Sequence, residues 1–137
     1  MNNQNRNVYL HSIELHGSIV TCMDEKNNDI IIALNNLRMH GFINETGNDK
    51  NIVYTDANLI LSNCKLYGNE PEFPARIIDF SLVRDGNIFG NLLEYPFLIN
   101  GEIQLVLTLE PHNKMTIRAS KMFMIVPDPV NNDENLQ

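Results

Sequence analysis

The sequence predicts an all-β protein: an antiparallel β-sandwich or partly open barrel of about eight strands, with a meander in its C-terminal half. Two observations lead to this class. Apolar residues recur at every second position through much of the chain, which is the period of a strand that buries one face. Turn signals rich in Gly, Pro and Asn separate these stretches, and no stretch reads convincingly as a helix.

Size and composition indicate one globular domain. The chain has 137 residues, of which 43% are hydrophobic and 20% are charged, and this balance is typical of a folded protein with its own core. We expect a disordered extension over 1–7, a single β domain over 8–127 and a disordered tail over 128–137, because both ends are polar.

The N-terminal third predicts a hairpin. Apolar residues alternate from Val8 to Met23, and Gly17 within this stretch indicates one long strand with a bend. A polar loop over Asp24–Asp29 leads into Ile30–Leu34, whose β-branched residues favour a strand.

The middle of the chain predicts shorter strands separated by polar loops. Asn35 and Asn36 interrupt the second strand, and a polar loop covers Asn44–Asn51. Two prolines make Asn69–Pro74 an irregular crossing segment, because proline cannot donate to a strand ladder. The expected strands are Leu37–Ile43, Ile52–Tyr54 and Leu59–Tyr67.

Three turn signals divide the C-terminal half into an antiparallel meander. Asp85-Gly86 favours a type I′ hairpin, because both central residues of that turn need positive φ. Asn100-Gly101 predicts a second hairpin of the same kind. The partners that these two turns imply are Val83 with Ile88 and Leu98 with Ile103.

The third turn joins two long strands within Glu102–Val126. Pro111 suits the second position of a type I turn, and Asn113 tolerates the left-handed conformation that closes it. The predicted partners are Leu109 with Met115, Leu107 with Ile117 and Leu105 with Ala119 on the buried face, and Glu110 with Lys114, Thr108 with Thr116 and Val106 with Arg118 on the other.

The last strand is apolar on both faces from Met122 to Val126. Such a run indicates a strand buried between two layers, or one whose outer face meets another subunit. We expect self-association of this chain, if it occurs, to use this strand.

Charge and hydropathy limit the classes of partner. The formal net charge is −7, whereas nucleic acids and anionic membrane surfaces are bound by cationic residues, so neither is expected as a partner. No apolar stretch has the length of a signal-peptide core or a membrane-spanning helix. We therefore expect a cytoplasmic protein in which Cys22 and Cys64 are reduced thiols.

No catalytic, metal-binding or cofactor-binding residue is assigned, and no cofactor is expected. The chain lacks a Gly-x-Ser-x-Gly elbow, a phosphate loop and a dinucleotide fingerprint. His11 and His16 differ by an odd number, so on a regular strand they point to opposite faces. Asp79 lies in an apolar stretch. We expect it to be either a general acid or base, or an outward-facing residue that pairs with Arg76 or Arg84.

The sequence favours a non-enzymatic protein-interaction or assembly module that binds a protein partner or copies of itself. Neutralisation of a basic protein is one form of this function that suits the negative charge. The alternative is a small barrel that binds a ligand, or acts as a metal-dependent enzyme, through the interior residues His11, His40 and Asp79. That alternative requires at least two of these side chains to meet in a pocket.

Overall fold

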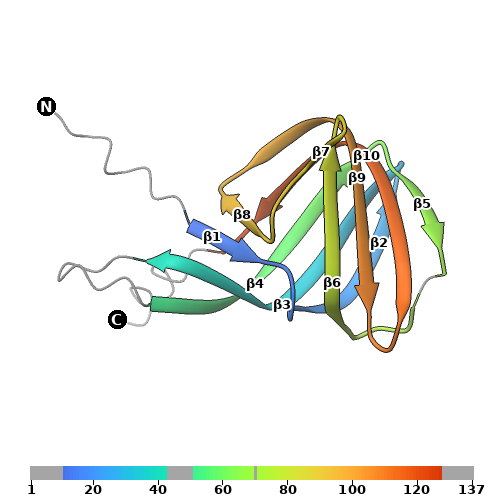
Figure 1. The fold of residues 1–137 in the computed structure, drawn as a ribbon. Helices are drawn as coiled ribbons and strands as arrows, with labels where there is room; N and C mark the ends of the chain where they lie inside the picture. Colours follow the sequence, from blue (N-terminus) through green and yellow to red (C-terminus); the bar gives the residue numbers. More distant parts are fainter. Residues whose placement is uncertain (1–10, 43–50, 70, 128–137) are drawn as a thin grey trace, which may run out of the picture.

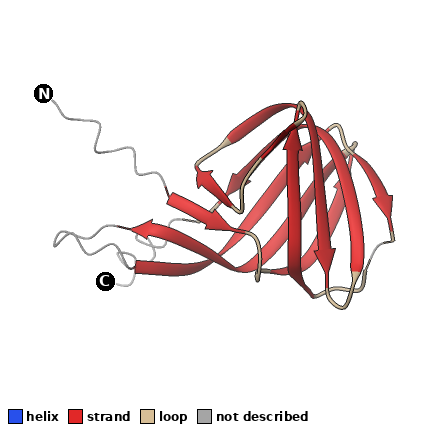
Figure 2. Cartoon of the chain, viewed as in Figure 1, coloured by secondary structure: helices blue, strands red, loops and turns tan. Residues whose placement is uncertain are grey.

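The computed structural model describes residues 11–42, 51–69 and 71–127, and all of the regular elements in these ranges are β-strands (Figure 2). The prediction of an all-β protein is confirmed. The predicted extension over 1–7, most of the loop over 44–51 and the tail over 128–137 lie outside the described ranges.

The described strands have the following bounds, in chain order. They are β1 (His11–Glu14), β2 (Ile19–Lys26), β3 (Asp29–Phe42), β4 (Asn51–Ser62), β5 (Lys65–Gly68), β6 (Ala75–Arg84), β7 (Asn87–Ile88), β8 (Leu92–Tyr95), β9 (Leu98–Leu109) and β10 (Asn113–Ile125).

Six of the strands close into an antiparallel barrel, in the order β2-β6-β9-β10-β4-β3, with β3 pairing back to β2 (Figure 1). The architecture is therefore the barrel form of the predicted class. Strand β8 pairs with β1, and β1 pairs with the end of β3, so these strands extend the sheet beyond the barrel. Strand β5 adds to β10, and β7 adds to β6.

Apolar side chains fill the interior of the barrel. Strand β9 alone contributes Leu105, Leu107 and Leu109, each with 0% of its surface exposed. An eight-stranded barrel has an interior just wide enough for side chains, so a six-stranded one is occupied by its own core. The inside of this barrel is a packed core, and function has to be sought on its surface.

The first predicted strand is divided in two. Strands β1 and β2 both pair with β3, but a turn separates them, in which the Ser18 hydroxyl donates a 2.6 Å hydrogen bond to the carbonyl of Leu15. Gly17 has φ of +92°, a conformation that glycine adopts without strain. The turn lets β2 join the barrel while β1 continues into the extension.

Two interruptions predicted in the middle of the chain are bulges within longer strands. Strand β3 runs through Asn36, whose φ is +59°, and the register with β4 shifts there. Strand β4 likewise joins two predicted strands into one. Asparagine tolerates the left-handed conformation, so at Asn36 the strand kinks without ending. The predicted strand Leu59–Tyr67 is wrong, because Asn63, with φ of +54°, lies between the end of β4 at Ser62 and the start of β5 at Lys65.

The Asp85-Gly86 hairpin is confirmed. Both residues have positive φ, +51° and +84°, and Val83 pairs with Ile88 as predicted. The chain after this turn leaves β6 to form β8 and then returns as β9, so β6 pairs directly with β9, and β9 pairs with β10.

The predicted hairpin at Asn100-Gly101 is wrong, because these residues lie inside β9. The ladder with β10 bulges at this point, between the pair Ile103–Ala119 and the pair Asn100–Lys121. The Asp85 turn packs on the bulge, where the backbone N–H of Glu102 donates a 2.9 Å hydrogen bond to Oδ1 of Asp85. Gly101 therefore supplies positive φ for a bend and not for a reversal.

The third hairpin forms, but its predicted register is wrong by two residues. Leu107 pairs with Met115, and Leu105 pairs with Ile117. Glu110 lies in the turn and not opposite Lys114, which pairs with Thr108, and the backbone N–H of Glu110 donates to the carbonyl of Arg76. Asn113 is then the first residue of β10 and pairs with Leu109, in place of the predicted left-handed turn residue.

Candidate functional site

A row of apolar side chains crosses the outer surface of four neighbouring strands of the barrel. Phe123 of β10 pairs with Leu98 of β9 on one side and with Ile60 of β4 on the other, and Ile60 pairs with Ile31 of β3. Residues that pair directly on one face lie about 5 Å apart, so these side chains adjoin. We call Leu98, Phe123, Ile60 and Ile31 the outer apolar row.

The outer apolar row contacts solvent. Leu98 is 60% exposed, whereas Phe123, Ile60 and Ile31 are partly buried. Ile125, which follows Phe123 on the same face but lies outside the row, is 52% exposed. The inner neighbours Met122 and Met124 are 0% and 5% exposed. The sequence correctly marked this strand as apolar on both faces, and its outer face is open in the described part of the chain.

Charged groups flank the row at the next level along the strands. Lys121 of β10 pairs with Ser62 of β4. On the other side of β4, Asp29 accepts a 3.3 Å hydrogen bond from the backbone N–H of Asn63. A cation and an anion therefore stand on either side of β4, beside the apolar side chains.

A second cluster lies on the outer face of the sheet extension, where β1 meets β3. Glu14 Oε1 lies 2.9 Å from Nε2 of His40 and 3.2 Å from the guanidinium of Arg38. The guanidinium also lies 5.7 Å from the ring centre of Tyr54 on β4. One carboxylate thus joins two strands of the extension through polar contacts.

This cluster shifts the protonation of its members. The hydrogen bond from His40, together with the charge of Arg38, lowers the pKa of Glu14 below its usual value of 4.5, against the opposing effect of burial. The interaction with Tyr54 raises the pKa of Arg38. Both shifts favour the charged forms, as expected for an ion pair that holds β1 to β3.

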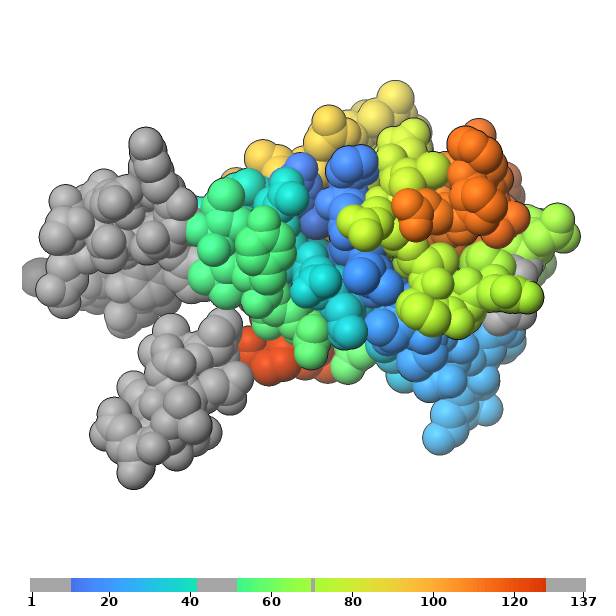
Figure 3. All heavy atoms as spheres, turned by 90° about the horizontal axis from the view of Figure 1, so that it is seen from below, coloured from blue at the N-terminus to red at the C-terminus, as the bar shows by residue number. Residues whose placement is uncertain are grey.

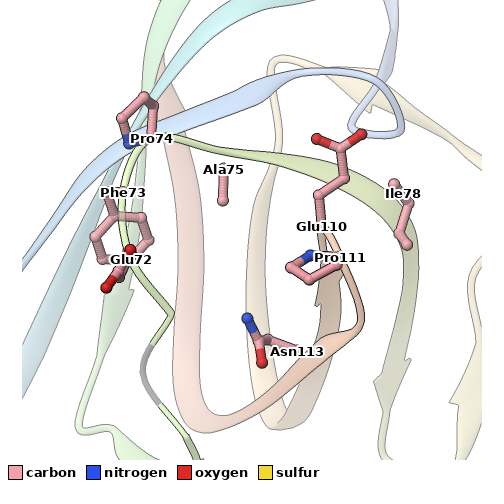
Figure 4. Close-up of a pocket in the computed structure, with 8 residues that line it drawn as sticks. All are labelled: Glu72, Phe73, Pro74, Ala75, Ile78, Glu110, Pro111 and Asn113. Atoms are coloured by element: carbon pink, nitrogen blue, oxygen red, sulfur yellow. The ribbon is translucent and has the colours of Figure 1, made fainter.

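A hollow of about 860 Å³ lies at one end of the barrel, between the segment that leads into β6 and the β9–β10 turn. These two segments adjoin in Figure 3, where they are yellow-green and orange. Glu72 and Glu110 line it from separate sides, and Phe73 contributes an aromatic ring (Figure 4). Glu110 lies 3.7 Å from Arg76, and both side chains are more than half exposed. The hollow lacks the buried, converging polar groups of a typical ligand site.

The structure does not bring His11, His40 and Asp79 together. His11 and His40 lie on opposite faces of the β1–β3 ladder, since Ser12 is the residue that pairs with His40. Asp79 is exposed on the outside of β6, and its Oδ1 accepts a 2.9 Å hydrogen bond from the backbone N–H of Phe80. No pair of these side chains meets in a pocket among the described residues.

Asp79 faces outward, as the second of its two predicted roles requires. Neither Arg76 nor Arg84, the predicted partners, pairs with it in the described ranges. Arg76 pairs with Glu110, and Arg84 lies over the ring of Phe89. The other two histidines, His16 and His112, are exposed in turns. Within residues 11–42, 51–69 and 71–127, no three His, Cys, Asp or Glu side chains are grouped so that they could hold a metal ion.

Sequence reasoning missed most of the outer apolar row and, apart from His40, the Glu14 cluster. Only Phe123 lies in the strand that the sequence singled out. Ile31, Ile60 and Leu98 each look like ordinary strand residues, and Glu14 finds partners 24 and 26 residues away along the chain. Only the strand pairing reveals either group.

No protein family, curated protein or solved structure is significantly similar to this chain. Of the described residues, none belongs to a helix with the length and hydropathy needed to cross a membrane.

Proposed function

We propose that this protein is a non-enzymatic interaction domain that docks against a protein surface through the outer apolar row. The observation that carries the proposal is the alignment of four apolar side chains on the outside of a barrel whose interior is already filled. Apolar surface on the outside of a small domain marks an interaction site when it is contiguous.

Strands β9 and β10, which carry Leu98 and Phe123 of the row, supply an internal comparison. Away from the row, the outer face of β9 and β10 is mainly polar: Gln104 pairs with Arg118, Thr108 with Lys114, and Val106, the apolar exception, with Thr116. The ladder therefore forms with few apolar residues on its outer face. The change from polar to apolar side chains within one pair of strands supports a role for the row outside the fold itself.

Compartment and charge bear on the kind of partner. Cys22 is exposed and Cys64 is half-buried, and neither forms a disulfide, which suits a reducing compartment such as the cytoplasm. The net charge of −7 favours a protein partner over a nucleic acid, and a basic protein is one that it would attract.

A photo-crosslinking experiment tests the proposal. A photoreactive amino acid is placed at Ile60, in the middle of the row, and in a second variant at Thr108 of β9, whose partners Lys114 and Asp79 are both polar. Both proteins are made and irradiated in the cells that normally produce the chain. We expect a discrete protein adduct from position 60 and none from position 108.

The adduct should depend on the row itself. Adding Phe123→Thr to the position 60 variant removes the ring beside the crosslinker while keeping a residue with high strand propensity. The adduct should then be lost. Irradiation that gives no adduct at position 60, or equal adducts at positions 60 and 108, would refute a docking role for the row.

A further inference from the structure

We propose that the outer apolar row docks against the same row of a second copy of this chain, around a twofold axis that runs along β4. This inference rests on the proposed function and adds the identity of the partner. The row has its centre on β4, where Ile60 lies between Phe123 on β10 and Ile31 on β3. A patch that meets itself around a twofold axis has to be self-complementary.

The flanking charges supply that complementarity. Lys121 on β10 and Asp29 on β3 lie on opposite sides of β4 and at the same level along it, next to Ser62 and Asn63. A rotation about an axis along β4 exchanges the positions of β10 and β3. Each charge therefore faces the opposite charge of the second copy.

The apolar contacts follow from the same rotation. Phe123 faces the second copy's Ile31, and Ile60 faces the second copy's Ile60, while Lys121 faces the second copy's Asp29. Every contact except the central one is made twice. Packed sheets lie about 10 Å apart, a gap that Phe and Ile side chains from both faces fill and that a Lys side chain spans.

The other face-to-face arrangement is disfavoured by charge. A twofold axis along the row would place Lys121 over the second copy's Ile125 and Asp29 over its Ala33, since these residues lie on the far side of the row. Both charges would then lose water without gaining a partner, which costs several kcal/mol in protein interiors. The axis along β4 avoids this loss.

The ends of the row lie outside the central contact. Leu98 of β9 and Asp24 of β2 are the outermost residues at this level, on strands two away from β4. The barrel surface is convex, so it curves away from the second copy at these positions. The contact is therefore concentrated on β10, β4 and β3.

Charge reversal tests the axis. The mass of the purified chain is measured by light scattering over a range of concentrations at about 0.15 M salt, where repulsion between the two acidic chains is screened beyond ~8 Å. We expect a dimer. Lys121→Asp and Asp29→Lys should each raise its dissociation constant at least about tenfold, because each puts like charges together twice.

The double variant Lys121→Asp/Asp29→Lys should restore the dimer, since it exchanges the two charges. Arg118→Asp is the matched control, because Arg118 is an exposed cation on the same strand but on the polar part of the outer surface. It should leave the dissociation constant unchanged. Circular dichroism of each variant verifies that the β-fold is retained.

A second measurement locates the axis without altering charge. In a Cys22→Ser background, Ile60→Cys should crosslink to itself with a short bismaleimide, because the axis passes through β4. Thr108→Cys, on the polar part of the outer surface of β9, should not. Cys64 is half-buried, and burial raises its pKa to about 11, so its thiol reacts slowly.

The outcomes separate the two proposals. A chain that stays monomeric, or a dimer that neither charge reversal weakens, overturns the twofold arrangement. If the monomeric chain still gives an adduct with a different protein from position 60 in cells, the docking function stands and only the identity of the partner is wrong. If neither experiment yields a contact at position 60, both proposals fail.

Discussion

Replacement of Gly101 by alanine tests the view that Asn100-Gly101 forms a bulge braced by the neighbouring turn. Gly101 has φ of +132°, and a Cβ there would lie 2.7 Å from Oδ2 of Asp85. The backbone conformation alone costs about 1–3 kcal/mol for a residue with a side chain. The Asp85 carboxylate must also move, and it then loses its hydrogen bond to the N–H of Glu102.

The expected loss of stability is about 2 kcal/mol. The lost hydrogen bond contributes about 1 kcal/mol, because it is exposed. The smaller conformational freedom of alanine in the unfolded chain offsets about 0.4–1 kcal/mol. The free energy of unfolding is measured by urea denaturation with circular dichroism. Gly90→Ala is the control, since no atom lies within 4 Å of its added Cβ.

A double-mutant cycle divides the effect between its two causes. In an Asp85→Gly background the carboxylate is absent, so Gly101→Ala should cost about 1 kcal/mol less than in the wild type. If the free energy of unfolding of Gly101→Ala, like that of Gly90→Ala, lies within about 0.5 kcal/mol of the wild-type value, the braced bulge is wrong. If Gly101→Ala lowers the free energy of unfolding equally in both backgrounds, backbone strain at position 101 explains the loss and Asp85 does not contribute to it.

Three further predictions concern the core, the Glu14 cluster and the thiols. Leu107→Ala should destabilise the protein by about 2–5 kcal/mol in urea denaturation, because Leu107 is 0% exposed, whereas Leu92→Ala, at 51% exposure, should cost under about 0.5 kcal/mol. The pKa of Glu14 is lowered in the folded state, so its stabilisation is complete above the unfolded value of 4.5 and is lost as the pH falls through the folded pKa. Glu14→Gln should therefore cost about 0.5–1 kcal/mol at pH 7 and much less at pH 3; a constant difference across this range would contradict the shift. Since burial raises the pKa of Cys64 to about 11, about one Cys64 thiol in a thousand is ionised at pH 8, and mass spectrometry should find exposed Cys22 alkylated before Cys64.

The class of fold and the inward-facing residues could be predicted because strands repeat every two residues. Leu105, Leu107, Met115 and Ile117 were assigned to the buried face, and each is 0% exposed. The turn at Asp85-Gly86 could be predicted for a similar local reason, because few residue pairs tolerate positive φ at both positions. These features depend on neighbours in the sequence.

Asn100-Gly101 shows where local reasoning ends. Its residue types suit a reversal as well as Asp85-Gly86 does, but a reversal there would remove Leu98 and Ile99 from the ladder with β10. A bulge keeps that ladder and adds the hydrogen bonds of Glu102 with the Asp85 turn. Contacts between residues 15 or more positions apart decided the outcome, and a turn propensity cannot register them.

The candidate site required more than the assignment of faces, and its geometry explains why. The predicted register of the third hairpin was wrong by two residues, yet Leu107 and Met115 stayed in the core, because a shift by two preserves the face of every residue. On the outer surface, a register shift by two residues changes which side chains lie next to one another. A shift by two between β4 and β10 would pair Ile60 with Lys121 or Ile125 instead of Phe123, and the continuous row would be lost. The interior of a barrel can therefore be predicted from alternation alone, whereas a surface that binds a partner depends on each strand pairing and on each bulge that sets it.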